Sequence, residues 1–92
     1  MNKIQRFKNE QAEICFEKKG MACIHCGKPA TQLAHIIAQD KVMLNKYGYL
    51  IIHHWKNRDP VCDLRCNAKS SIRNHPLAIE QKIKEIEEER NQ

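Results

Sequence analysis

Four of the five cysteines form two closely spaced pairs, and this pattern constrains the fold more than any other feature. Cys23 and Cys26 are separated by two residues, and Cys62 and Cys66 by three. Two such pairs match a tetrahedral four-thiolate zinc site, in which each pair supplies two corners. Because four thiolates leave no open position on the ion, this zinc would be structural. Cys15 has no partner at ligand spacing and is expected in the core.

Two other interpretations of the pairs stay open: ordinary buried cysteines and a redox C-x-x-C motif. The length of the chain favours zinc. Its 92 residues predict one domain, over 1–92, with a thin core, and two Phe, two Tyr and one Trp add little aromatic packing. A bound zinc would contribute folding free energy on the order of 10 kcal/mol, enough to hold so small a fold.

The hydropathy pattern places the chain in a reducing compartment. No apolar run approaches the roughly 18 residues of a membrane span, and the basic N-terminus lacks the apolar stretch of a signal peptide. We therefore expect a cytoplasmic protein with no membrane partner. In that compartment cysteine pairs are more often metal ligands than disulfides.

The formal charge of +5 is unevenly distributed. Residues 1–75 carry thirteen Lys and Arg against six Asp and Glu, whereas residues 76–92 carry three against five. The basic part also contains every Cys and His, so the positive charge surrounds any site. This distribution favours a polyanionic partner such as DNA, although the charge could serve solubility alone.

The apolar periodicity predicts an α+β fold. The expected helices begin and end near capping residues, such as Asp40 and Gly48 around a short central helix. A core over residues 20–75 would lie between two terminal helices. The expected elements are helices over 2–18, 40–47, 66–74 and 77–90, strands over 32–37 and 49–53, a cysteine knuckle over 22–30 and a polar loop over 54–60.

Three further residues stand in a defined order around the cysteine pairs. His35 follows the first pair within the run Leu-Ala-His-Ile-Ile, Asn57 stands five residues before the second pair, and Asn67 directly follows it. In this order, over about residues 20–75, the chain resembles the HNH endonucleases of the His-Me, or ββα-metal, finger type. The segment Pro-Val-Cys-Asp-Leu-Arg-Cys-Asn resembles a small phage-associated branch of that family.

The resemblance implies a small, treble-clef-like ββα-metal finger with a structural zinc, flanking helices and metal-dependent cleavage of DNA. His35 would be the general base that deprotonates the attacking water. Asn57 would orient His35 through a side-chain or backbone contact. Asn67 would ligate one catalytic Mg²⁺ or Mn²⁺ through its amide oxygen, and that ion would polarise the scissile phosphate. Taken singly, Asn57 also fits a turn and Asn67 a helix cap.

One position departs from the family pattern. Many members carry Asp or His directly before the base, as the other metal ligand, and this chain has Ala34 there. Replacement ligands are His53, His54 or Asp63, and their spacing does not choose among them.

Six basic residues are expected to contact phosphates. Such contacts fix a duplex without reading its sequence, so specificity would need a homodimer, a protein partner or the terminal helices. The alternative for these residues is a solvated surface. They are Arg65, Lys69 and Arg73, at four-residue intervals, together with Lys28, Lys56 and Arg58.

The leading functional hypothesis is a DNA endonuclease or nickase that uses His35, Asn57 and Asn67. The alternative is a catalytically inactive zinc module on the same fold that binds nucleic acid or a protein partner, and Ala34 is its main support. A small redox or zinc-carrier protein is the third hypothesis and rests only on the cysteine pairs.

Overall fold

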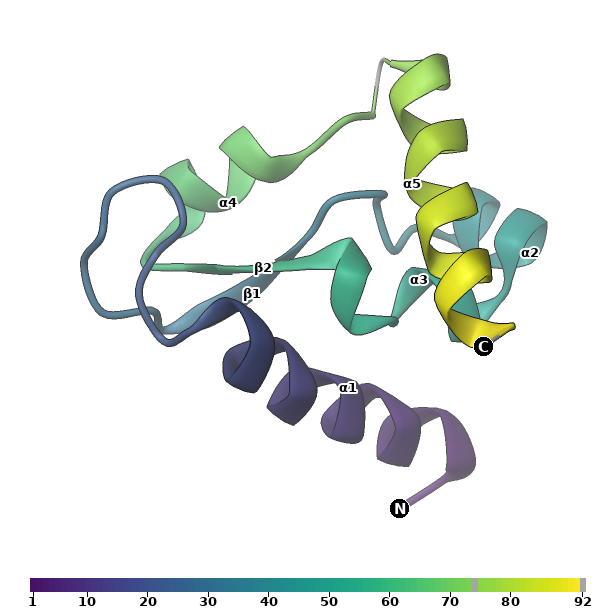
Figure 1. The fold of residues 1–92 in the computed structure, drawn as a ribbon, viewed down its shortest axis with the longest axis horizontal. Coiled ribbons are helices and arrows are strands. Elements are labelled where there is room, and N and C mark those ends of the chain that lie inside the picture. The colour runs from purple at the N-terminus through teal and green to yellow at the C-terminus, as the bar shows by residue number, and fades with distance from the viewer. Residues whose placement is uncertain (74, 92) are drawn as a thin grey trace.

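The computed structural model describes residues 1–73 and 75–91, and it confirms a small α+β fold with one two-stranded sheet in that part of the chain (Figure 1). The sheet crosses the middle of the molecule, with α1 on one side and α4 on the other (Figure 1). The elements are α1 (Lys3–Lys19), β1 (Gln32–His35), α2 (Lys41–Tyr47), α3 (Tyr49–Ile52), η1 (Trp55–Asn57), β2 (Arg58–Val61), α4 (Leu64–Ser70) and α5 (Pro76–Arg90).

Capping residues fix the ends of α1 and α2, and those of α2, Asp40 and Gly48, are the ones that the sequence predicts. The side chain of Asn2 accepts the backbone N–H of Gln5 at 2.8 Å and begins α1. Asp40 caps α2 in the same way through the N–H of Met43 at 2.9 Å. Gly20 and Gly48 end the two helices with φ of 89° and 83°, a conformation that favours glycine.

The sheet pairs β1 with a segment that we expected to be a loop. β1 and β2 are antiparallel, and His35 lies opposite Arg58 in the register. The predicted strand over 49–53 is wrong, because those residues form the single turn of α3 after Gly48. The backbone N–H of Ile52 bonds to the carbonyl of Gly48 at 3.1 Å. A short apolar run fits a buried helical turn as well as a strand, and here packing selects the helix.

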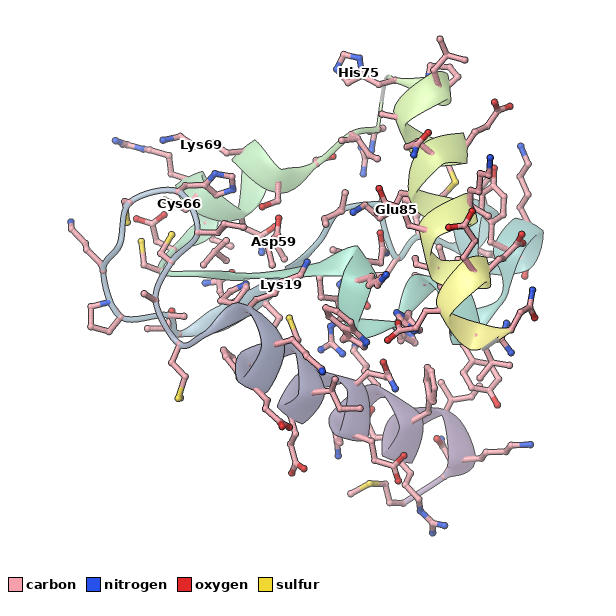
Figure 2. All side chains as sticks on the ribbon, in the orientation of Figure 1. Lys19, Asp59, Cys66, Lys69, His75 and Glu85 are labelled. Atoms are coloured by element: carbon pink, nitrogen blue, oxygen red, sulfur yellow. The ribbon has the colours of Figure 1, made fainter. Side chains whose placement is uncertain are left out.

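The buried carboxylate of Asp59 in β2 is neutralised by a cation from α1. Lys19 Nζ donates to the carbonyl oxygen of Arg58 at 2.7 Å and to Asp59 Oδ1 at 3.1 Å. The two side chains are 20% and 10% exposed, and they approach each other between α1 and β2 (Figure 2). This arrangement explains how Arg-Asp-Pro-Val, which reads as a turn, becomes a buried strand.

The buried apolar residues form two clusters. The first contains Ala34 and Val61 of the sheet with Cys23 and Cys66. The second contains Ile37, Ile52 and Ile79 and joins α5 to the centre of the chain. Ile86 is also buried, so the inward face predicted for the last helix is confirmed at two of its isoleucines.

The helix expected over 66–74 has different bounds. Asp63 accepts the backbone N–H of Cys66 at 2.8 Å and caps α4, which begins at Leu64, three residues after the end of β2. It ends at Ser70, and Arg73 lies beyond it, while Asn74 is outside the described residues. Across the described residues we find no helix with the length and apolarity needed to span a membrane.

The substitution Lys19→Met should destabilise the protein by about 1–3 kcal/mol, because Asp59 would stay buried without its donor and the carbonyl of Arg58 would keep only the weak thiol donor of Cys15. Lys18→Met, at an exposed neighbouring position, is the matched control and should change the free energy of unfolding by less than about 0.5 kcal/mol. Urea unfolding followed by circular dichroism measures both. Equal stability of the two variants would contradict this account of the buried strand.

Candidate metal centre and adjoining cleft

The first cysteine pair lies on a tight knuckle. The backbone N–H of Cys23 bonds to the carbonyl of Lys28 at 2.7 Å, and the N–H of Gly27 bonds to the carbonyl of Cys23 at 2.9 Å. Gly27 has φ of 80°, which allows the chain to reverse within this short segment. The knuckle thus presents Cys23 and Cys26 to the same side.

The second pair joins β2 to α4 and meets the first. Cys62 follows the last residue of β2, and Cys66 lies in the first turn of α4. The four Sγ atoms all lie within 4.8 Å of one another, and other sulfur-bearing side chains gather beside Cys66 in Figure 2. The predicted clustering of the four cysteines is confirmed.

The sulfur distances fit a tetrahedral metal ion. Zn–S bonds of about 2.3 Å place the sulfurs of a tetrahedral site roughly 3.8 Å apart. Here Sγ of Cys62 lies 3.3 Å from Sγ of Cys26 and 3.7 Å from Sγ of Cys66, far beyond a disulfide bond of about 2.05 Å. The cluster could therefore hold a structural metal ion such as zinc. Cys15 lies apart from the cluster and is fully buried. Its Sγ donates a hydrogen bond to the carbonyl oxygen of Arg58 at 3.2 Å.

The thiols of the cluster differ in acidity. Burial raises the pKa of Cys23, but the backbone groups of His25, Cys26 and Cys62 more than offset it and lower that pKa to about 6. The hydrogen bond with Cys26, together with burial, raises the pKa of Cys62 to about 12. Four neighbouring thiolates repel one another, so a cation between them is what would allow all four to ionise.

The purified protein should bind one Zn²⁺ per chain, and removal of the metal should unfold it, because the two cysteine pairs join the knuckle, β2 and α4. Cys26→Ser should lose the metal and most of the thermal stability. Cys15→Ala is the matched control and should keep the full zinc content. Native mass spectrometry and thermal melts measure both quantities, and full zinc loading of Cys26→Ser would contradict the four-thiolate site.

A cleft of about 370 Å³ lies between β1, the segment that follows it and α4. His35 and Asn67 both line it, although they are 32 positions apart in the chain and come from β1 and α4. Ala34, between two cleft-lining residues of β1, is fully buried and packs with Cys66 instead. The strand thus alternates between the cleft and the cysteine-side core.

The amide of Asn67 has a defined orientation. Its Nδ2 donates to Oε1 of Gln32 at 2.9 Å, and in the described part of the chain no donor contacts its Oδ1. Asp40 also lines the cleft, and its Oδ1 accepts the N–H of Met43. The cleft therefore presents two hard oxygen donors beside an imidazole.

His35 is paired with His53. Nε2 of His35 lies 3.1 Å from Nδ1 of His53, and the two rings meet edge to face. Burial is the main cause that lowers the pKa of His35 to about 3, with further contributions from Arg58, His53 and Lys8. Burial, with Lys8 and Arg58, lowers the pKa of His53 to about 4. Both imidazoles are therefore neutral at neutral pH.

Of the three replacement ligands considered from sequence, only His53 contacts His35. His54 is occupied elsewhere, with Nε2 3.1 Å from Oε2 of Glu89 and Nδ1 accepting the N–H of Lys56. Asp63 caps α4. The structure thus distinguishes the three candidate ligands, which their spacing in the sequence did not.

Asn57 forms hydrogen bonds with the backbone that follows His35 and with the backbone that precedes His53. Its carbonyl accepts the N–H of Ile36 at 2.7 Å, and its side-chain Oδ1 accepts the N–H of Ile37 at 2.8 Å. Its Nδ2 donates to the carbonyls of Ile37 and Ile52 at 3.1 and 2.9 Å. These residues adjoin His35 and His53, and Asn57 itself is fully buried. Asn57 fixes the segments that carry the two imidazoles without contacting either ring.

Replacing Asn57 with Ala should destabilise the protein by about 3 kcal/mol, because it leaves one buried N–H and two buried carbonyls without side-chain partners. Asn67→Ala, which removes one partly exposed hydrogen bond, should cost less than about 1 kcal/mol. Chemical denaturation of both zinc-loaded variants measures the difference. A cost for Asn57→Ala no larger than that for Asn67→Ala would show that the buried amide is dispensable.

The six basic residues expected at phosphates lie in different environments. Lys28, Arg65, Lys69 and Arg73 are exposed, and Lys69 projects outward from α4 (Figure 2). Lys56 is half-buried and lies over the ring of Trp55. Arg58 departs from the expectation: it is 5% exposed, and its guanidinium donates to the carbonyl of Lys8 at 2.8 Å. Arg58 joins β2 to α1 and offers no surface for a phosphate.

Sequence reasoning missed two residues at the cleft. Asp40 was recognised only as a helix cap, and Lys8 was not singled out. Lys8 Nζ lies 3.2 Å from Oε1 of Gln39, a residue of the cleft wall. No local signal identifies Lys8, because its position depends on how α1 packs against the sheet. Asp40 could have been suspected from its place five residues after His35.

Comparisons with known proteins give no assignment, since no protein-family model, curated protein or solved structure matches the chain. A functional proposal therefore depends on the cleft and the cysteine cluster themselves.

Proposed function

We propose that the protein is a metal-dependent DNA endonuclease or nickase of the HNH type, built on a treble-clef-like ββα-metal finger with a structural zinc. The observation that carries this proposal is the cleft lined by both His35 and Asn67. The resemblance to the HNH endonucleases selected these two residues from the sequence, and a shared cleft is what joint action on one phosphodiester requires.

In this proposal His35 is the general base. A neutral imidazole can take a proton from the attacking water, and the lowered pKa of His35 keeps it in that form. An anionic phosphodiester in the cleft would raise that pKa towards neutrality, because it offsets the positive charges of Lys8 and Arg58. Asn57 keeps His35 in place through the backbone of the two residues that follow it.

The donors in the cleft fit a hard divalent cation. Mg²⁺ and Mn²⁺ prefer oxygen ligands, and the uncontacted Oδ1 of Asn67 and the carboxylate of Asp40 would hold such an ion in place of the ligand missing at Ala34. When bound, the cation would neutralise charge on the phosphate and on the leaving oxygen.

The charge around the cleft suits a nucleic acid backbone. Arg73 lines the cleft, and Lys69 and Arg65 lie on the exposed surface of α4 that leads to it. These side chains would contact phosphates and position the duplex, and such contacts do not distinguish one base sequence from another. Specificity for a site would come from a second copy of the chain or another protein.

Incubation of the zinc-loaded protein with supercoiled plasmid should give nicked product only when Mg²⁺ or Mn²⁺ is added. His35→Ala should reduce the rate at least about 100-fold, because it removes the general base. His75→Ala, at an exposed histidine that projects away from the fold (Figure 2), should keep most of the activity. Agarose gels that separate supercoiled, nicked and linear DNA measure the rates.

Plasmid that stays supercoiled under every condition, with the protein folded and loaded with zinc, would contradict the nuclease proposal. It would favour the inactive zinc module, in which the fully buried Ala34 marks the position of a lost metal ligand.

A further inference from the structure

The contact between His35 and His53 raises the question of which imidazole carries the shared proton. Their nitrogens are 3.1 Å apart, a hydrogen-bonding distance, and within the described residues no other polar group contacts the ring of His35. His53 is 5% exposed, so water does not replace this contact readily. Two neutral imidazoles can share such a contact only if one donates and the other accepts.

The direction of this hydrogen bond decides whether His35 can act as a base. If Nε2 of His35 donates, Nδ1 of His35 keeps its lone pair and can accept a proton. If Nδ1 of His53 donates instead, the hydrogen of His35 must sit on its own Nδ1, and the ring presents only an N–H to the cleft.

Tautomer preference favours donation by His35. Neutral histidine in water is more stable with its hydrogen on Nε2 than on Nδ1. When His35 donates, both rings carry their hydrogen on Nε2, the preferred form. When His53 donates, both rings carry it on Nδ1, the less stable form. No charged group bonds to either ring in the described structure to reverse this preference.

We propose that His53 is a positioning residue that accepts a hydrogen bond from Nε2 of His35 at its own Nδ1, and thereby keeps Nδ1 of His35 unprotonated and available to the cleft as the base. This inference rests on the proposed nuclease function for its catalytic consequence, whereas the assignment of the tautomers rests on the geometry of the pair and on the tautomer preference of neutral histidine.

The same contact matters after the proton transfer. Uptake of a proton from water at Nδ1 leaves His35 as an imidazolium and releases hydroxide to attack the phosphorus. The Nε2–H of that imidazolium is then a charged donor to His53, and charged hydrogen bonds are roughly twice as strong as neutral ones. The contact therefore offsets burial and the positive charges of Lys8, from α1, and Arg58, from β2, which both disfavour the imidazolium.

These two cations also argue against the pair as a further metal site. Two imidazole nitrogens at this distance could ligate one transition metal, but Lys8 and Arg58 raise the cost of placing a divalent cation between them. A shared proton leaves the pair neutral and is the occupant that this environment favours.

Two variants of His53 separate hydrogen bonding from packing. His53→Asn keeps an oxygen or nitrogen near the place of Nδ1, whereas His53→Leu fills the space without an acceptor. The Leu variant should lose about tenfold or more in nicking rate, and the Asn variant should recover most of that loss. The rate of the Leu variant should also depend on pH differently, since the pKa of the substrate-bound His35 falls without its acceptor. Zinc content and circular dichroism verify that both variants are folded.

The direct test is ¹⁵N NMR of the histidine rings in the zinc-loaded protein at neutral pH, where two-bond couplings identify the protonated nitrogen. We expect the hydrogen of His35 on Nε2 and its Nδ1 unprotonated, with a mixture of tautomers in His53→Leu. A hydrogen on Nδ1 of His35 would overturn the proposal, as would nicking by His53→Leu within twofold of the unmodified protein. If the expected tautomers are found but no DNA is cut, the nuclease function fails while the hydrogen-bond assignment stands.

Discussion

The structure depends on the fully buried amide of Asn57, which connects η1 to the segment that follows β1 and to the end of α3. Its hydrogen bonds reach the backbone just after His35 and just before His53, and its own carbonyl continues the pairing between β1 and β2. A buried amide that is fully paired admits one arrangement of its neighbours, because any shift leaves a polar group without a partner. The positions of the two imidazoles follow from that constraint.

The cysteine cluster and the cleft receive alternate residues of β1. Ala34 and Val61 pack with two of the clustered cysteines, whereas His35 lines the cleft with Asn67. Cys66 and Asn67 are adjacent in α4, so the helix that completes the cysteine cluster also brings an amide oxygen to the cleft. A metal ion held by the four thiols would thus fix the position of Asn67 relative to His35 without taking part in the chemistry.

The sequence predicted those features that local chemistry determines. The cysteine spacing predicted a four-sulfur cluster, and Asp40 and Gly48 predicted the ends of α2, because ligand geometry and capping depend on a few neighbouring residues. It failed at β2, which contains Arg58 and Asp59 and resembles a turn. Those residues are buried only because Lys19 and the backbone of α1 meet them, and no pattern within the strand reveals that contact.

In the candidate site, too, the sequence predicted the residues but not the tertiary contacts between them. His35 and Asn67 could be selected from their order along the chain, but their common cleft could not be predicted. From the sequence, His53 was one of three equivalent candidates for a replacement metal ligand. The structure distinguishes it, because α3 is a helical turn and not the expected strand. That turn places His53 beside His35, and it follows from tertiary packing of Ile51 and Ile52 rather than from their β-branched character.

We propose that the cleft between β1 and α4 takes a hard divalent cation at oxygen donors, apart from the cysteine cluster. Addition of Mn²⁺ to the ¹⁵N-labelled, zinc-loaded protein tests it most directly, because this paramagnetic ion broadens the NMR signals of nearby groups. The account predicts selective broadening at Asn67, Asp40 and His35, with Gly27 in the knuckle left sharp. Broadening confined to the glutamates of α5, or none at the cleft, would contradict it.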